Sequence, residues 1–111
     1  MGFKKICTID DVWEGEMAEF ELDGHEVLIV HLDGGRVMAW QGTCPHQDIP
    51  LSEGKLEFGL LTCRAHLWQF DAASGCSVNP TGCELAQYPV RLEGDEVQVD
   101  VEGVVPKHAA I

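Results

Sequence analysis

Two short segments of this chain carry the same pattern of cysteine and histidine, and they constrain the fold more than any other feature. The first is TCPHQDIPL at 43–51 and the second is TCRAHLWQF at 62–70. Each begins with Thr-Cys and reaches a histidine within three residues, as C-x-H in the first and C-x-x-H in the second. Thiolate and imidazole are ligands of transition metals. A fold that uses both pairs must bring two separate loops to one site.

The four candidate ligands are Cys44, His46, Cys63 and His66, with sixteen residues between the two pairs. Two cysteines and two histidines can hold one tetrahedral zinc ion, but paired zinc ligands are usually spaced by two to four residues, which C-x-H fits poorly. In a two-iron cluster, the two thiolates bind one iron and the two imidazoles bind the other. On the residues alone a structural zinc domain stays open as an alternative.

The rest of the chain has the pattern of an all-β protein. Turn signals at Asp23-Gly24, Asp33-Gly34-Gly35 and 93–95 lie between apolar or alternating runs, which is typical of β-hairpins. The continuous apolar run 27–30 predicts a strand that is covered on both faces. Valines alternate with polar residues over 97–102, which indicates a half-buried strand.

The length of 111 residues fits one domain. Residues 41–87 are rich in Gly, Pro, Cys and Ser. We therefore expect a β-sandwich frame formed by residues 1–40 and 88–104, with a loop-rich subdomain inserted at 41–87. Residues 9–16 could hold one helical turn capped by Asp10 or Asp11. The end of the chain, 105–111, is expected to be a partly frayed tail.

Nineteen acidic residues face seven basic ones, a formal charge of −12. Such a chain repels nucleic acid and anionic membranes and is steered toward basic partner surfaces. No apolar run approaches 18 residues, and the first residues contain no apolar signal-peptide region. We expect a cytoplasmic monomer with neither nucleic acid nor a membrane among its partners.

The remaining candidates for chemistry receive structural interpretations. We expect Trp13 and Trp40 to lie in the core together with Cys7. Two further histidines, His25 and His31, fall in strands and are interpreted as ordinary strand residues. Loop packing is the expected role of Cys76 and Cys83. Outside the paired motifs, the sequence contains no constellation typical of a catalytic base or nucleophile.

The spacing C-x-H-x16-C-x-x-H, with the CPHQ segment and a third loop SVNPTG, resembles the Rieske proteins over residues 3–102. The closing stretch LAQYPVRLEGDEVQVDV is similar to the last hairpin of that family. The resemblance implies a Rieske-type antiparallel β-sandwich. It also implies one [2Fe-2S] cluster bound by Cys44, His46, Cys63 and His66, with the two histidines on the outer iron.

Within the family, ICTIDDVWEGEM and CRAHLWQFDAASG resemble the ferredoxin components of bacterial toluene-type monooxygenase systems. This implies a one-electron carrier rather than an enzyme. It would pass electrons from an NADH-dependent FAD/iron–sulfur reductase to a hydroxylase with a diiron site. Ferredoxins of aromatic ring-hydroxylating dioxygenases are the alternative, and a small nitrite reductase component is a less favoured one.

Partner docking is expected at the loops that carry the ligands. The expected docking residues are Gln47, Asp48, Ile49, Pro50, Leu67, Trp68 and Pro80. For Trp68 a second interpretation is open, in which the ring packs beneath the second loop. For Arg64 two roles are open, namely tuning of the cluster and a salt bridge to a surface acid.

Overall fold

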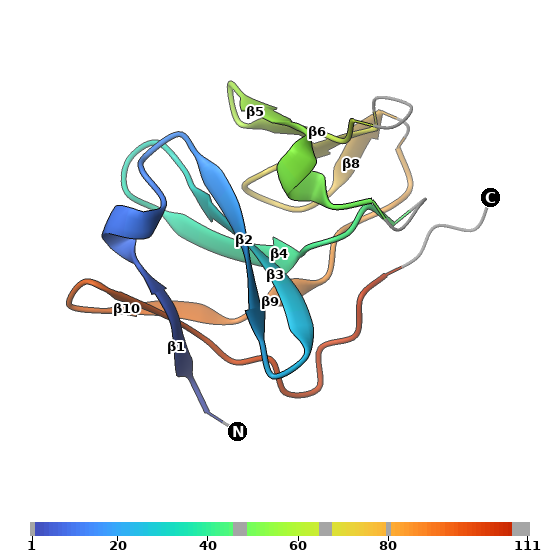
Figure 1. The fold of residues 1–111 in the computed structure, drawn as a ribbon. Helices are drawn as coiled ribbons and strands as arrows, with labels where there is room; N and C mark the ends of the chain where they lie inside the picture. Colours follow the sequence, from blue (N-terminus) through green and yellow to red (C-terminus); the bar gives the residue numbers. More distant parts are fainter. Residues whose placement is uncertain (1, 46–48, 65–67, 80, 108–111) are drawn as a thin grey trace.

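We describe residues 2–45, 49–64, 68–79 and 81–107 of a computed structural model (Figure 1). In these ranges the chain forms eleven β-strands and two short 3₁₀ helices. In chain order they are β1 (Lys4–Thr8), η1 (Ile9–Asp11), β2 (Met17–Leu22), β3 (His25–His31), β4 (Val37–Gln41), η2 (Leu51–Glu53), β5 (Lys55–Glu57), β6 (Leu60–Thr62), β7 (Gln69–Asp71), β8 (Ser77–Asn79), β9 (Gln87–Tyr88), β10 (Val90–Glu93) and β11 (Glu96–Val99).

The strands form three antiparallel sheets, which confirms the all-β prediction. One sheet has the order β2-β3-β4-β9 and a second has the order β1-β11-β10. The third sheet, β5-β6-β7-β8, is built entirely from residues between 55 and 79 and lies beside the other two in Figure 1. The segments that carry the cysteine and histidine pairs flank this third sheet or lie within it.

The expected hairpins form where the turn residues permit a left-handed backbone. Leu22 pairs with His25, so Asp23 and Gly24 are the two turn residues, with φ of 52° and 82°. Positive φ at both positions is what a tight two-residue hairpin turn requires, and Asp and Gly are among the residues that tolerate it. The turn between β10 and β11 also has two residues, between the paired Glu93 and Glu96, but only the first of them, Gly94, has a positive φ, at 60°.

Strand β3 is shared by two hydrophobic cores, which confirms that both of its faces are covered. Val27 and Ile29 pack in a core that also holds Cys7, Val97 and other residues of the first two sheets. The alternating residues Leu28 and Val30 face a second core, which extends to the third sheet. The period of two along a strand sends successive side chains to opposite faces, so one continuous apolar run serves both cores.

The two tryptophans expected in the core, Trp13 and Trp40, differ in burial. Trp40 is buried as expected, but the core position expected for Trp13 is wrong, because this side chain is 70% exposed and donates its indole N–H to the carbonyl of Asp10 at 3.1 Å. Residues 9–16 form only the single turn η1, and the adjacent Val12 takes the buried place instead.

The cap of η1 also differs from the expectation. Thr8 is the N-cap and Asp11 is the third residue of the turn, whose carboxylate accepts the backbone N–H of Thr8 at 2.8 Å. This hydrogen bond lowers the pKa of Asp11. The first turn is therefore stabilised by a Thr–Asp capping box rather than by an aspartate at the cap position.

Lys107, in the segment expected to be a tail, is hydrogen-bonded to Gln41. The backbone N–H of Lys107 donates to the side-chain Oε1 of Gln41 at 2.8 Å, and its carbonyl accepts from Nε2 of the same side chain at 3.0 Å. Val105, two residues earlier, is exposed. Residues 108–111 lie outside the described residues.

Candidate metal centre

The two cysteine loops are closed by the same hydrogen bond. The backbone N–H of Cys44 donates to the carbonyl of Ile49 at 2.9 Å, and that of Cys63 donates to the carbonyl of Trp68 at 2.7 Å. In both loops the donor and acceptor are five residues apart. Each cysteine therefore starts a loop of the same length, although the histidine comes one residue later in the second.

The residues that flank the two loops are also paired in the same way. Thr43 forms an isolated antiparallel bridge with Pro50, and Thr62 pairs with Gln69 across β6 and β7. The shared Thr-Cys sequence thus corresponds to a shared local structure, in which an antiparallel pair presents a loop at its end. His46 and His66 belong to these loops but lie outside the described residues.

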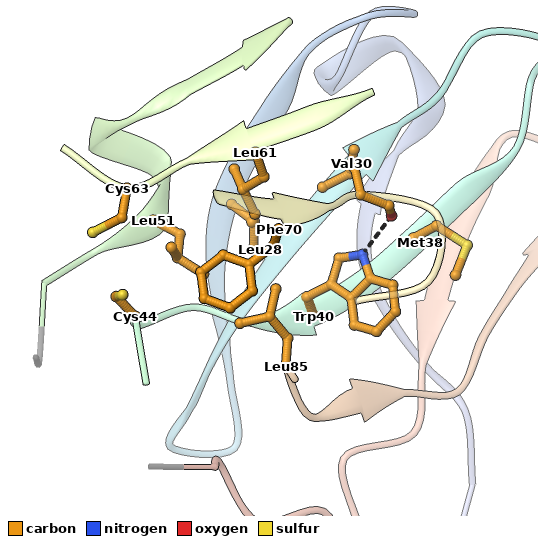
Figure 2. Packing of buried hydrophobic residues seen from close by; sticks show 11 residues of the cluster. Leu28, Val30, Met38, Trp40, Cys44, Leu51, Leu61, Cys63, Phe70 and Leu85 are labelled. Carbon is orange, nitrogen blue, oxygen red and sulfur yellow. Dashed lines mark hydrogen bonds between the residues drawn. The ribbon is translucent and has the colours of Figure 1, made fainter. Parts of the chain in front are cut away.

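Both cysteine side chains are buried in one hydrophobic core, at 1% exposure for Cys44 and 0% for Cys63. Leu51 and Phe70 belong to the same core. Figure 2 shows the two sulfur atoms at the same end of this core, beside Leu51. Neither cysteine forms a disulfide. Two soft donors held on matched loops suit an iron–sulfur or zinc centre.

Trp40, in β4, connects the sheet β2-β3-β4-β9 to the third sheet. Its indole N–H donates to the carbonyl of Ala72 at 3.0 Å, inside the core. The ring also lies against Gly75, where an added Cβ would be only 2.5 Å from the ring atom Cζ3. This close approach holds the connection between β7 and β8 of the third sheet against β4.

Three of the seven expected docking residues lie within the described residues. Ile49 and Trp68 are half-buried and pack on the core that holds the cysteines. The Trp68 ring lies 6.5 Å from that of Phe70, tilted by 36°, which supports its packing beneath the second loop. Pro50 is half-buried. The remaining expected docking residues, Gln47, Asp48, Leu67 and Pro80, lie outside the described residues.

Arg64, directly after the second cysteine, forms a surface ion pair. Its Nε donates to Oε1 of Glu53 at 2.6 Å, and both side chains are more than half exposed. Of the two roles left open for Arg64, the structure shows the salt bridge. Exposed pairs of this kind contribute at most about 1 kcal/mol to stability.

The other cysteines and histidines have local roles. Cys83 donates its backbone N–H to the hydroxyl of Ser77 at 2.9 Å, and Cys76 is exposed. The Nδ1 of His25 lies 3.2 Å from the hydroxyl of Tyr88, and that of His31 lies 2.8 Å from the carbonyl of Val12. Among the described residues no cluster of three or more His, Cys, Asp or Glu side chains could hold a metal ion.

Sequence reasoning missed one residue next to the site, the buried Gln41. Its side chain is fully buried and lies three residues before Cys44. The signal was present in the sequence, because a glutamine ends an otherwise apolar strand, VMAWQ. A buried polar side chain in such a position needs hydrogen-bond partners.

The comparison with known families decides the kind of centre. The model of the Rieske [2Fe-2S] domain matches residues 2–89. The chain belongs to the Rieske [2Fe-2S] family. This Rieske chain therefore holds a Rieske-type [2Fe-2S] cluster, which supplies a reversible one-electron couple.

Similar proteins are ferredoxin components of oxygenase systems. The ferredoxin component of an alkene monooxygenase system from Xanthobacter autotrophicus is 44% identical over 98 residues, which cover 87% of this chain and 80% of the relative. The ferredoxin component of a biphenyl 2,3-dioxygenase from Rhodococcus jostii is 42% identical, over 95% of this chain and 98% of the relative. The Rieske chain is thus a ferredoxin, an electron carrier rather than an enzyme.

A solved structure shows the same fold. The complex of reduced oxygenase and oxidized ferredoxin in carbazole 1,9a-dioxygenase contains a chain that matches with a TM-score of 0.78 and 25% identity, over 87% of this chain and 91% of that one. In the described part of the present chain, no helix has the length and apolar character needed to cross a membrane.

Proposed function

We propose that this ferredoxin carries single electrons to the hydroxylase of an aromatic monooxygenase system. The observation that carries the proposal is the pair of matched loops, each of which starts at a buried cysteine and contains a histidine. The cluster ligands in this proposal are Cys44, His46, Cys63 and His66. The thiolates would hold the inner iron, and the imidazoles would hold the outer one.

The electron donor in this proposal is an NADH-dependent FAD/iron–sulfur reductase, and the acceptor is a hydroxylase with a diiron site. The identity of 44% to an alkene monooxygenase ferredoxin supports a monooxygenase partner. A dioxygenase partner is the second candidate, favoured by the 42% identity to a biphenyl dioxygenase ferredoxin. The oxygenase–ferredoxin complex in a solved dioxygenase system shows that a related ferredoxin contacts its oxygenase directly.

Docking would occur at the tip formed by the two loops. The described members of this tip, Ile49, Pro50 and Trp68, are partly exposed, and we add Gln47, Asp48, Leu67 and Pro80 to them. A net charge of −12 would steer the carrier toward basic partner surfaces and allow fast encounter with a small contact area. We also propose a cytoplasmic location, and we propose a monomer because a net charge of −12 opposes self-association.

Single-turnover mixing tests the choice of partner. The dithionite-reduced ferredoxin is mixed separately with a diiron aromatic hydroxylase and with a Rieske dioxygenase, and its visible absorbance is followed. Faster oxidation by the diiron hydroxylase is expected. Faster oxidation by the dioxygenase would replace the first candidate with the second, and no oxidation by either would contradict the carrier function.

The ligand assignment has its own test in His66→Cys. Replacing an imidazole with a thiolate adds negative charge and a softer donor to the outer iron, which should lower the reduction potential and change the visible spectrum. An unchanged spectrum and potential would show that His66 is not a ligand.

A further inference from the structure

The buried amide of Gln41 uses all of its hydrogen-bonding capacity. Its Nε2 donates to the carbonyls of Thr43 and Lys107 at 2.9 and 3.0 Å. Its Oε1 accepts the backbone N–H groups of Ala86 and Lys107, both at 2.8 Å. A side-chain amide has two donor hydrogens and two acceptor positions, so no position is left over.

This arrangement fixes the orientation of the amide. A flipped amide would place its NH₂ group against two N–H donors and its oxygen against two carbonyls, so the network allows one orientation. Gln41 also donates its own backbone N–H to the carbonyl of Ala86 at 3.0 Å. One side chain thus joins three segments that are far apart in the sequence: the entry to the first cysteine loop, the strand-like segment at Ala86, and the chain end.

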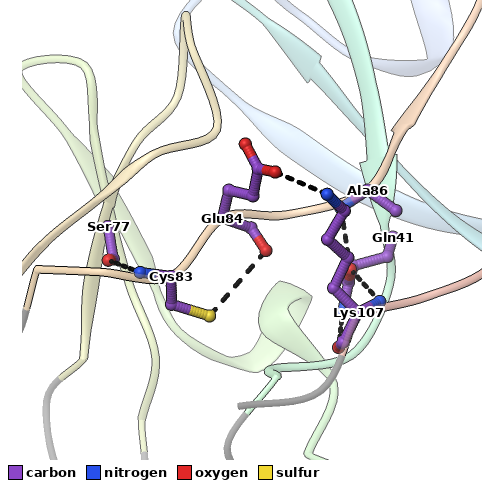
Figure 3. Close-up of polar contacts among 6 residues, drawn as sticks. All are labelled: Gln41, Ser77, Cys83, Glu84, Ala86 and Lys107. Atoms are coloured by element: carbon purple, nitrogen blue, oxygen red, sulfur yellow. Dashed lines mark hydrogen bonds and ion pairs between the residues drawn. The ribbon is translucent and has the colours of Figure 1, made fainter.

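The contact with the chain end has a second component. The Nζ of Lys107 forms an ion pair with Oε1 of Glu84, which lies in the segment that leads to Ala86 (Figure 3). Both side chains are about half exposed, so this pair contributes little. The two backbone bonds of Lys107 to Gln41 are the ones shielded from solvent on the Gln41 side, since that side chain is fully buried.

The bond from Gln41 to Thr43 connects this network to the metal centre. Thr43 precedes Cys44 and pairs with Pro50 across the base of the first loop. Gly42, between Gln41 and Thr43, accepts the backbone N–H of Leu51 at 2.8 Å, just beyond the other end of the same loop. The four hydrogen bonds of the Gln41 amide do not involve the described residues of the second cysteine loop, which the β6–β7 pairing holds instead.

We propose that the segment at Lys107 acts as a clasp: Lys107 holds the Gln41 amide, and Gln41 in turn positions the first cysteine loop but not the second. Gln41 is a positioning residue, because it touches the loop backbone and not the metal ligands. The relevance to cluster binding rests on the proposed function of Cys44. The positioning of the first loop by Gln41 does not depend on that proposed function.

Two truncations that differ by one residue test the clasp. A chain that ends at Lys107 keeps both backbone bonds, whereas a chain that ends at Pro106 loses them. Hydrogen exchange followed by mass spectrometry on the purified, cluster-loaded protein compares the peptide around the first loop, 42–51, with that around the second, 61–70. We expect exchange of the first-loop peptide to rise at least about tenfold in the shorter chain, because the loss of one buried hydrogen bond already corresponds to roughly that factor and this chain loses two. Exchange of the second-loop peptide should not change.

A general loss of stability would raise exchange in both peptides and would overturn the proposal. Equal exchange in all three chains would overturn it as well, and so would an equal rise in both truncations, which would assign the effect to residues beyond Lys107. Lys107→Ala is the matched control, since it removes the ion pair with Glu84 and leaves the backbone bonds in place. Exchange of both peptides in this variant should match that in the full chain.

Gln41→Glu in the full-length chain provides a second test that does not shorten the protein. The two N–H donors still meet an oxygen, but the second oxygen faces the carbonyls of Thr43 and Lys107, which repel it when the group is ionised. The ratio of first-loop exchange in this variant to that in the native protein at the same pH should therefore rise with pH, and so should the ratio of their rates of iron loss to a chelator. The reduction potential gives a further readout, and it should shift only when the first loop loosens. Equal exchange and equal iron loss in the variant and the native protein at every pH would contradict the positioning role.

Discussion

The backbone N–H of Cys63 donates to the carbonyl of Trp68 at 2.7 Å, so the residue that closes the second loop is also the one whose ring packs on Phe70. Loop closure and core packing are thus combined in one residue. The first loop ends at the smaller Ile49, which packs on the same core.

This combination leads to a prediction for Trp68→Ala. The carbonyl that accepts from Cys63 remains, but the contact with Phe70 is lost. Loss of a large, partly buried ring should cost about 2 kcal/mol of stability and accelerate cluster loss to a chelator. Absorbance decay in the presence of a chelator measures this. A variant that keeps the native decay rate but transfers electrons slowly would show that the ring serves docking and not packing.

A pair of glycines with the same backbone conformation tests the contact between Gly75 and Trp40. Gly75 and Gly59 have φ of 78° and 76°, but an added Cβ meets the Trp40 ring at 2.5 Å in the first and nothing within 4 Å in the second. Gly59→Ala should cost about 1 kcal/mol for backbone strain alone. Gly75→Ala should cost about 2 kcal/mol more, from overpacking. Urea unfolding measures both, and equal losses would contradict the close packing of Trp40.

In the turn of the β5–β6 hairpin, one residue can be replaced by a residue that fits the turn conformation better. Phe58 has a φ of 52° and a fully exposed side chain, and it precedes Gly59 in a two-residue turn between Glu57 and Leu60. Asn-Gly is the preferred pair for such a turn, because asparagine tolerates this conformation. Phe58→Asn should raise the free energy of unfolding by about 1 kcal/mol. A loss of stability would show that the Phe58 ring makes a contact that matters.

The buried thiol of Cys7 makes the stability of the folded protein fall at alkaline pH. Burial raises the pKa of the Cys7 thiol from 9.0 to about 11, and the nearby Asp11 carboxylate adds to the rise. Between these two values the unfolded chain loses the proton and the folded chain keeps it, so stability falls as the pH rises through this window. The stability of the native protein relative to Cys7→Ala should therefore decrease between pH 9 and pH 11, and the difference should be constant below pH 8. A flat difference across the whole range would show that the thiol ionises normally.

Glu19 has an effect of the same sign as Cys7, but at acid pH. Partial burial raises the pKa of its carboxyl, and the negative charge of Glu26 adds to this. Because the folded pKa lies above the unfolded one, ionisation of Glu19 costs stability at neutral pH and costs nothing once both states are protonated. Glu19→Gln should have the higher melting temperature at pH 7, and the advantage should vanish below about pH 4. An advantage that persists in acid would point to a cause other than charge.

The sequence was sufficient for the features that follow from local patterns. The hairpin at Asp23-Gly24 follows from turn chemistry, and the double burial of 27–30 follows from an apolar run without alternation. The Cys and His spacing predicted a Rieske cluster, which the family match confirms, while the four ligands stay a prediction. The features that were missed depend on contacts between distant segments. Trp13 is excluded from the core by Val12, and Lys107 is ordered by Gln41, which is 66 residues away.

Low-temperature EPR of the dithionite-reduced protein tests the central claim most directly. A [2Fe-2S] cluster with two thiolates on one iron and two imidazoles on the other should give a rhombic signal with an average g near 1.9, roughly the value expected for mixed nitrogen and sulfur ligation. That signal would establish His46 and His66 as the ligands that accompany the buried Cys44 and Cys63. A colourless, EPR-silent sample that contains zinc would contradict the electron-carrier function and leave a zinc-stabilised binding domain.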